Sequence, residues 1–149
     1  MKRLTGKLMV LSWMILCVCL YAGNALAAET VQEIIQYEDG TYAEITLTEN
    51  DTLTRSNTKS GTKTFTYKNN SGQILFTYTL TGYFQYGGST SKAVSCSTKY
   101  NVVRGNWSKK SDKYYCSGNT AYGNATFSNS STSKTAKLTI TCSKTGTIS

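Results

Sequence analysis

Apolar and polar residues alternate most regularly along residues 63–86. Along the second arm of this stretch, apolar or aromatic side chains recur at alternate positions: Ile74, Phe76, Tyr78, Leu80, Phe84 and Tyr86. This period of two is typical of a strand with one buried and one solvated face. The first arm carries Phe65 and Tyr67 in the same phase, and the Asn-Asn-Ser-Gly of residues 69–72 favours a tight turn. We therefore predict that residues 63–86 form the central hairpin of an all-β domain.

Shorter alternating stretches flank this hairpin. Asp39-Gly40, with aromatic neighbours, predicts a two-residue turn between a strand that begins near Ile34 and a strand over residues 42–48. The polar residues 50–61 predict a loop. Further strands are expected over these ranges, separated by turns rich in glycine, asparagine and serine: 94–102, 113–117, 120–128 and 136–142.

The inward faces of the later strands follow from the same alternation. In the first of them, one face is expected to carry Val94, Cys96, Thr98, Tyr100 and Val102. Two later strands are expected to face inward with Ala121, Gly123, Ala125, Phe127, Ala136, Leu138, Ile140 and Cys142. Short strands at this spacing indicate a single antiparallel β-sandwich of about seven to eight strands, immunoglobulin-like in broad architecture, with a small β-barrel as the alternative.

The N-terminus has the composition of an export signal. Three bases, Lys2, Arg3 and Lys7, precede an apolar run over residues 8–20, and small residues surround position 27. The run is shorter than the roughly 20 residues that a membrane-spanning helix needs. We predict a signal peptide over residues 1–27, cleavage after Ala27, and a secreted product without a transmembrane anchor, held at the cell surface, if at all, without a covalent link.

Charge divides the rest of the chain into two segments. Residues 28–51 contain seven acids and no lysine or arginine, and they include the Asp-Gly hairpin. Residues 52–149 contain thirteen bases and one acid, Asp112, a net charge of +12. This asymmetry predicts either an acidic segment docked on a basic β-sandwich domain, or a basic body that meets polyanions. The alternative is that the charges only keep a threonine-rich protein in solution.

Three cysteines follow the predicted cleavage site: Cys96, Cys116 and Cys142. Alternation places Cys96 and Cys142 on inward faces, so we predict a disulfide between these two and leave Cys116 as a free thiol or an intermolecular bridge. The order of the two cysteines around Trp107 is that of immunoglobulin-like domains. A rival pairing stays open, because a hairpin centred on residue 106 places Cys96 opposite Cys116.

Several of these motifs resemble a family of small exported proteins of Gram-positive bacteria that is classed only as a domain of unknown function. The resemblance covers most of the mature chain and rests on residues 38–42, 54–72, 80–86 and 138–142. It favours the pairing of Cys96 with Cys142. It implies no catalytic residues, because none are assigned to the family.

The composition favours a protein without enzymatic activity. The chain has no histidine, so the commonest general base and the Ser-His and Cys-His nucleophile pairs are missing. Asp112 is the only carboxylate of the basic segment, and three separated cysteines do not make a zinc site. We predict no catalytic residue, no metal and no cofactor.

One segment combines bases and aromatic rings around a turn: Arg104, Trp107, Lys109, Lys110, Lys113, Tyr114 and Tyr115. Cationic side chains bind phosphate or sulfate, and aromatic rings stack on sugars. The alternative is that Trp107 and one tyrosine are core residues and the lysines protect a sheet edge. We predict a non-enzymatic binding module for anionic polymers or glycans of the cell envelope or a host surface, with no specific nucleic-acid partner. A secreted toxin or membrane-active protein is the alternative.

Overall fold

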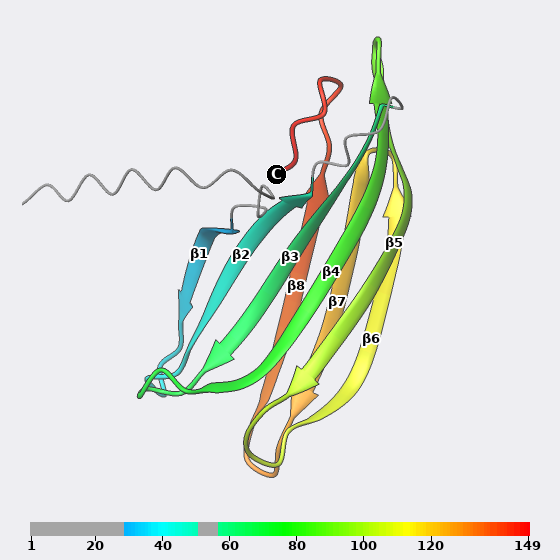
Figure 1. The fold of residues 1–149 in the computed structure, drawn as a ribbon. Helices are drawn as coiled ribbons and strands as arrows, with labels where there is room; N and C mark the ends of the chain where they lie inside the picture. The colour runs from blue at the N-terminus through cyan, green and yellow to red at the C-terminus, as the bar shows by residue number, and fades with distance from the viewer. Residues whose placement is uncertain (1–28, 51–56) are drawn as a thin grey trace, which may run out of the picture.

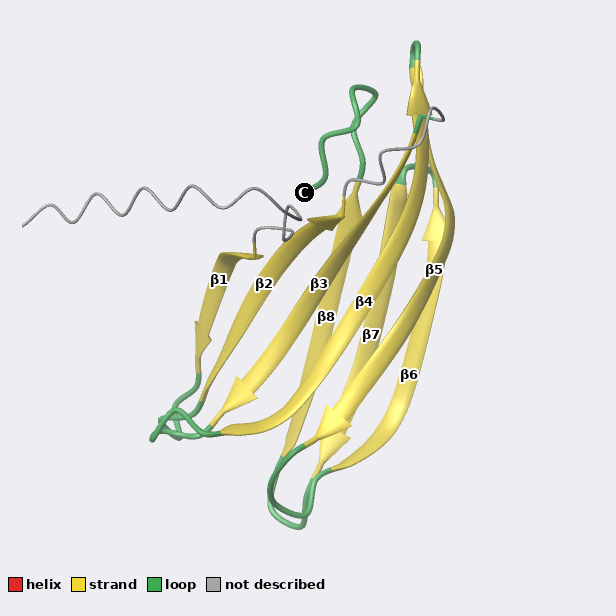
Figure 2. Cartoon of the chain, in the orientation of Figure 1, coloured by secondary structure: helices red, strands yellow, loops and turns green. Residues whose placement is uncertain are grey.

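The computed structural model describes residues 29–50 and 57–149, and these residues form eight β-strands joined by turns and loops (Figures 1 and 2). The strands are β1 (Glu29–Gln36), β2 (Tyr42–Asn50), β3 (Thr58–Lys68), β4 (Ile74–Gly87), β5 (Thr90–Val102), β6 (Ser108–Ser117), β7 (Thr120–Ser128) and β8 (Ser133–Thr141). The prediction of an all-β fold is confirmed. The predicted signal peptide lies outside the described residues.

The strands form two stacked antiparallel sheets. Sheet A has the order β1-β2-β3-β4-β5, and sheet B has the order β6-β7-β8. Sheet B lies over β3, β4 and β5 (Figure 1). The predicted β-sandwich is therefore confirmed, and the alternative of a β-barrel is wrong, because the described strands belong to two separate sheets. Both sheets are simple meanders, so the likeness to immunoglobulin domains extends to the two-layer architecture alone.

The central hairpin is the one that the alternation predicts. β3 and β4 pair along their length, with Phe65 opposite Tyr78. In the turn, the side-chain oxygen of Asn69 accepts hydrogen bonds from the backbone N–H groups of Ser71 at 3.1 Å and Gln73 at 2.8 Å. Gly72 completes the turn with a φ of 78°, a conformation that glycine adopts without a steric penalty.

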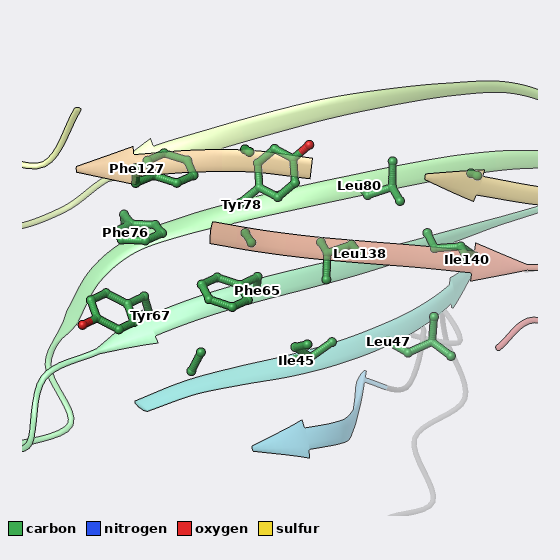
Figure 3. Close-up of a cluster of buried hydrophobic side chains, with 14 of the residues drawn as sticks. Ile45, Leu47, Phe65, Tyr67, Phe76, Tyr78, Leu80, Phe127, Leu138 and Ile140 are labelled. Carbon is green, nitrogen blue, oxygen red and sulfur yellow. The ribbon is translucent and has the colours of Figure 1, made fainter. Parts of the chain in front are cut away.

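The core fills the space between the sheets. Figure 3 shows Leu138 and Ile140 of β8 close to Phe65 of β3 and to the β2 side chains Ile45 and Leu47. At the opposite side, Phe76 of β4 stacks on Phe127 of β7, with 4.2 Å between ring centroids. These side chains are almost completely removed from water, so apolar burial across the two sheets is the main stabilising term.

Irregularities in strand pairing change the predicted faces. At the start of β4 the pairing shifts beside Lys68, and Ile74 is 37% exposed, so its expected place on the buried face is wrong. Between β4 and β5 the pairing passes from Tyr83↔Ser95 to Phe84↔Ala93, so β5 has an extra residue at this point. The bulge reverses the alternation: Ala93 is buried, whereas Val94 is 53% exposed. The inward placement of Val94 is therefore wrong. A further bulge lies at Lys110 in β6 and breaks the alternation there. The strand begins at Ser108, ahead of the residue 113 that the sequence predicted.

The acidic segment belongs to the sandwich. β2 pairs with β3 along its length, so residues 29–50 supply two of the five strands of sheet A. β3 begins at Thr58, inside the stretch that the sequence predicted as a loop. Ion pairs join acids of this segment to bases further along the chain: Glu44–Lys68 at 2.6 Å, Glu49–Lys59 at 3.1 Å and Asp39–Lys134 at 3.1 Å.

Candidate functional site

The seven predicted binding residues lie in the β5–β6 connection and along β6, and the structure separates them into four environments. Trp107 belongs to the core. It is 8% exposed, and its ring lies 5.4 Å from that of Tyr67 and 5.1 Å from that of Phe76. Its ring faces are occupied by the protein itself, so Trp107 does not form part of a binding surface.

Lys109 belongs to an internal polar network rather than to a free basic surface. Its ammonium group lies 3.0 Å from Asp112 and 4.3 Å from the centroid of the Tyr100 ring. The Asp112 carboxylate also accepts hydrogen bonds from the hydroxyl of Tyr78 at 2.9 Å and that of Thr98 at 3.1 Å. We call these four residues, Tyr78, Thr98, Lys109 and Asp112, the Asp112 network.

The Asp112 network joins the two sheets at their edge. Tyr78 and Thr98 come from β4 and β5 of sheet A, and Lys109 and Asp112 come from β6 of sheet B. Burial, followed by the hydrogen bond to Asp112, raises the pKa of Tyr78. The tyrosine hydroxyl therefore stays protonated and donates a hydrogen bond to the carboxylate, while Lys109 compensates the negative charge of Asp112. This arrangement is a structural link whose polar groups are paired with one another.

Arg104, Lys110 and Tyr114 are exposed: the first lies in the β5–β6 connection beside β4, and the other two lie on β6, the edge strand of sheet B. Arg104 follows β5, where its backbone N–H donates to the carbonyl of Leu75 at 3.0 Å. Lys110 is the extra residue of the β6 bulge. Tyr114 lies opposite the buried Gly123, yet it is 51% exposed because β6 is an edge strand.

Lys113 and Tyr115 lie on the outer face of sheet B, and two neighbouring strands extend this surface. The Tyr115 ring stacks on that of Tyr122 in β7, with 4.9 Å between centroids and 16° between planes. In the next row, Lys113 lies opposite Asn124 of β7, and Asn124 lies opposite Lys137 of β8. We call these five residues, Lys113, Tyr115, Tyr122, Asn124 and Lys137, the Tyr/Lys face.

The Tyr/Lys face is cationic and open. Tyr115 is 59% exposed, and Lys113, Asn124 and Lys137 are also exposed. Asp112 is the only acid of residues 52–149, and it points to the other side of β6. Among the residues that the structure describes, neither Lys113 nor Lys137 forms an ion pair, in contrast to Lys68 and Lys134. Their charges remain available to an external anion.

The sequence missed Tyr122 as a member of this surface. The residue alternates with the buried Ala121 and Gly123, so the period of two along β7 already places it outward. Lys137 alternates with the inward-facing Ala136 and Leu138, but nothing in the sequence brought it together with Lys113. That juxtaposition depends on the register of three strands.

The three cysteines are thiols in the structure, and none is at disulfide-bonding distance from another. Cys142 is buried, as its alternation predicted, and its thiol donates to the carbonyl of Ser143 at 3.4 Å. Cys96 lies on β5 and Cys116 on β6, and both pack against the core from the stacked sheet edges. The disulfide between Cys96 and Cys142 is not present, and its pairing stays a prediction.

Comparisons with protein-family models, with curated proteins and with solved structures found no match to this chain. The resemblance to a family of exported Gram-positive proteins therefore stays a prediction. Residues 29–50 and 57–149 contain no helix with the length and apolar character needed to cross a membrane. In the same residues, no group of three or more histidine, cysteine, aspartate or glutamate side chains gathers as metal ligands do.

Proposed function

We propose that the protein is a secreted, non-enzymatic binding module whose Tyr/Lys face holds anionic polymers or glycans of the cell envelope or of a host surface. The observation that carries this proposal is the juxtaposition of an exposed tyrosine stack with two unpaired lysines on one flat sheet face. Export, which the predicted signal peptide supplies, is part of the proposal.

The spacing of the groups suits a repeating polyanion. Lys113 and Lys137 lie two strands apart in one row, which corresponds to about 10 Å between their backbones. Their flexible side chains reach anionic groups at a range of separations. The stacked rings of Tyr115 and Tyr122 lie in the neighbouring row and present an apolar surface with polar rims to a sugar ring.

The test is retention on immobilised heparin, a sulfated glycan, and on immobilised polyphosphate, which has no sugar. The K113Q/K137Q double variant is expected to elute at lower salt than the wild-type protein from both, because exposed charge contacts are screened by salt. The matched control is K92Q/K99Q, which removes the same charge from the outer face of sheet A, where Lys92 lies opposite Gln85 and Lys99 opposite Thr79.

Equal shifts for the two double variants would overturn the proposal, because retention would then depend on net charge and not on the Tyr/Lys face. A Y115A/Y122A variant separates the two chemistries. It is expected to weaken retention on heparin and to leave retention on polyphosphate unchanged, because only the glycan offers rings for stacking.

Membrane disruption is the competing function. The outer faces of both sheets carry mainly threonine, lysine and other polar side chains, not a band of apolar ones. We therefore expect no dye release when the protein is added to vesicles that contain anionic lipid. Release at low protein concentration would favour the membrane-active alternative over polymer binding.

A further inference from the structure

The two sheets approach each other unusually closely beside Cys96 and Cys116. Gly82 of β4 faces Ala121 of β7: a Cβ atom placed on Gly82 would lie 3.1 Å from the Cβ atom of Ala121. Cys96 is the partner of Gly82 in sheet A, and Cys116 is the partner of Ala121 in sheet B. Cross-strand partners share a face of their sheet, so both cysteines point inward in the row next to this contact.

Other contacts hold β5 and β6 side by side in the same antiparallel order. The backbone N–H of Ala93 donates to the carbonyl of Gly118 at 2.9 Å. Further along, the Thr98 hydroxyl donates to Asp112 at 3.1 Å. Cys96 lies between Ala93 and Thr98, and Cys116 lies between Asp112 and Gly118. The two thiols therefore face each other between these two hydrogen bonds, which hold β5 beside β6.

We propose that Cys96 and Cys116 form an intramolecular disulfide that joins sheet A to sheet B along the β5/β6 edge. A disulfide requires Cβ atoms about 3.5–4.5 Å apart, and the sheet separation at the neighbouring Gly82–Ala121 contact lies close to this range. The proposal does not depend on polymer binding.

Cys142 is a poor partner for either thiol. It follows β8, and β7 lies between β8 and β6 in sheet B. The backbone N–H of Cys142 donates to the carbonyl of Asn119 at 3.0 Å, which fixes this position beside the β6–β7 turn. Neighbouring strands are about 4.8 Å apart, so the intervening strand keeps the Cys142 thiol away from the β5/β6 edge. This proposal therefore replaces the pairing of Cys96 with Cys142.

Formation of the bond needs a disulfide oxidant. The thiolate of one cysteine attacks a sulfur of the oxidant, forms a mixed disulfide and releases the first thiol of the oxidant. The second cysteine then attacks the cysteine sulfur of the mixed disulfide and releases the second thiol of the oxidant. The two cysteines lose two protons and two electrons, and the electrons reduce the disulfide bond of the oxidant. A small-molecule disulfide such as oxidised glutathione satisfies this balance.

The folded dithiol is expected to react slowly. Burial and a hydrogen bond with the Cys116 thiol raise the pKa of the Cys96 thiol, and the thiolate is the reactive form. Oxidation of the folded, reduced protein should therefore accelerate as pH rises from 7 to 9, whereas oxidation during folding should be fast. The test accordingly refolds the protein in a mixture of oxidised and reduced glutathione.

Trypsin places the three cysteines in separate peptides: residues 93–99, 114–134 and 138–144. After refolding and alkylation of free thiols, non-reducing peptide mapping by mass spectrometry is expected to find residues 93–99 linked to residues 114–134. A link between residues 93–99 and 138–144 would overturn the proposal. Full alkylation of all three cysteines, or a covalent dimer through Cys116, would also overturn it.

Thermal unfolding gives an independent readout. Reduction of the wild-type protein is expected to lower Tm by about 10 °C, because the bond closes the loop of residues 96–116 and restricts the unfolded chain. A C142A variant keeps the other two thiols and should show the same drop. A C116A variant should unfold at one Tm with or without reductant. A reduction-sensitive Tm in C116A would contradict the assigned pair.

Discussion

The two lateral edges of the sandwich differ in how their strands are held. At the β5/β6 edge, the two sheets are connected by a backbone hydrogen bond, the Asp112 network and a facing pair of thiols. At the other edge, β1 pairs with β2 alone, and its Val31 and Ile34 side chains are 55% and 56% exposed. The difference shows that half-buried polar groups on the strands themselves link the two sheets at the β5/β6 edge.

At the β1 edge, the β1–β2 turn connects sheet A to sheet B. Asp39 in the β1–β2 turn accepts hydrogen bonds from the Thr41 hydroxyl and from the Thr41 backbone N–H at 3.0 Å, and it pairs with Lys134 of β8. The ammonium group of Lys134 also lies 3.9 Å from the centroid of the Tyr37 ring. This attachment is exposed to water, so it is expected to contribute less than the buried network at the opposite edge.

The largest expected effect is that of Asp112→Ala. The substitution leaves the Lys109 ammonium group and the hydroxyls of Tyr78 and Thr98 without their acceptor in a half-buried site. We expect a loss of about 3 kcal/mol in the free energy of unfolding, measured by urea denaturation at pH 7. A loss below about 1 kcal/mol would show that water replaces the carboxylate and that this edge is no more tightly held than the other.

A smaller effect is expected for Tyr78→Phe, which removes one donor and leaves the other partners of Asp112 in place. The loss is expected to be about 1 kcal/mol at pH 7. Because the pKa of Tyr78 is raised in the folded state, the stabilising contribution of its protonated form is present below about pH 10 and declines as pH rises further. Urea titrations at pH 7 and pH 11 should therefore give a smaller difference between variant and wild type at pH 11.

At the β1 edge, Asp39→Asn is expected to lower stability less than Asp112→Ala or Tyr78→Phe, and the loss should depend on pH. Hydrogen bonds from Thr41, together with the ion pair to Lys134, lower the pKa of Asp39 to about 2. Its contribution is therefore present above the unfolded value near 4 and is lost as pH falls toward 2. Thermal unfolding of wild type and Asp39→Asn should differ most at pH 7 and converge near pH 2. A constant difference across this range would assign the effect to turn conformation instead of charge.

The smallest effect is expected for Ile34→Thr on β1. The side chain is 56% exposed on the outer face, opposite Glu44, so little apolar burial is lost. The free energy of unfolding should change by less than about 0.5 kcal/mol, measured under the same urea conditions as Asp112→Ala. A larger loss would mean that the outer face of β1 is covered in solution, and analytical ultracentrifugation of both proteins would then show whether a second copy covers it.

The alternation in the sequence was sufficient to predict the layers but not the edges. It identified the β3–β4 hairpin and the inward faces of β7 and β8, because the alternation of buried and more exposed positions runs along most of these strands. It gave the wrong face for Val94, because a single extra residue in β5 reverses the phase and leaves no mark in the composition. Bulges depend on pairing with a neighbouring strand, which a single segment does not encode.

Only part of the candidate site was predicted, again because strand pairing is not encoded in a single segment. Lys113 and Tyr115 were recognised because they are close in sequence, whereas Tyr122 and Lys137 join them only through strand register. For Trp107 the sequence left two environments open, because an aromatic residue beside lysines suits both a ligand surface and a core. The structure places it against Tyr67 and Phe76, which lie far from it in the sequence.

The consecutive order of strands within each sheet has a consequence for folding kinetics. Every hydrogen-bonded strand pair joins neighbours in the chain, so most loops that must close are short and the barrier to forming each sheet is low. The exceptions are long-range contacts such as that of Ile148, which lies against Gly61 of β3. During synthesis from the N-terminus, sheet A can therefore assemble early, whereas Ile148 can dock on β3 only after it has been synthesised.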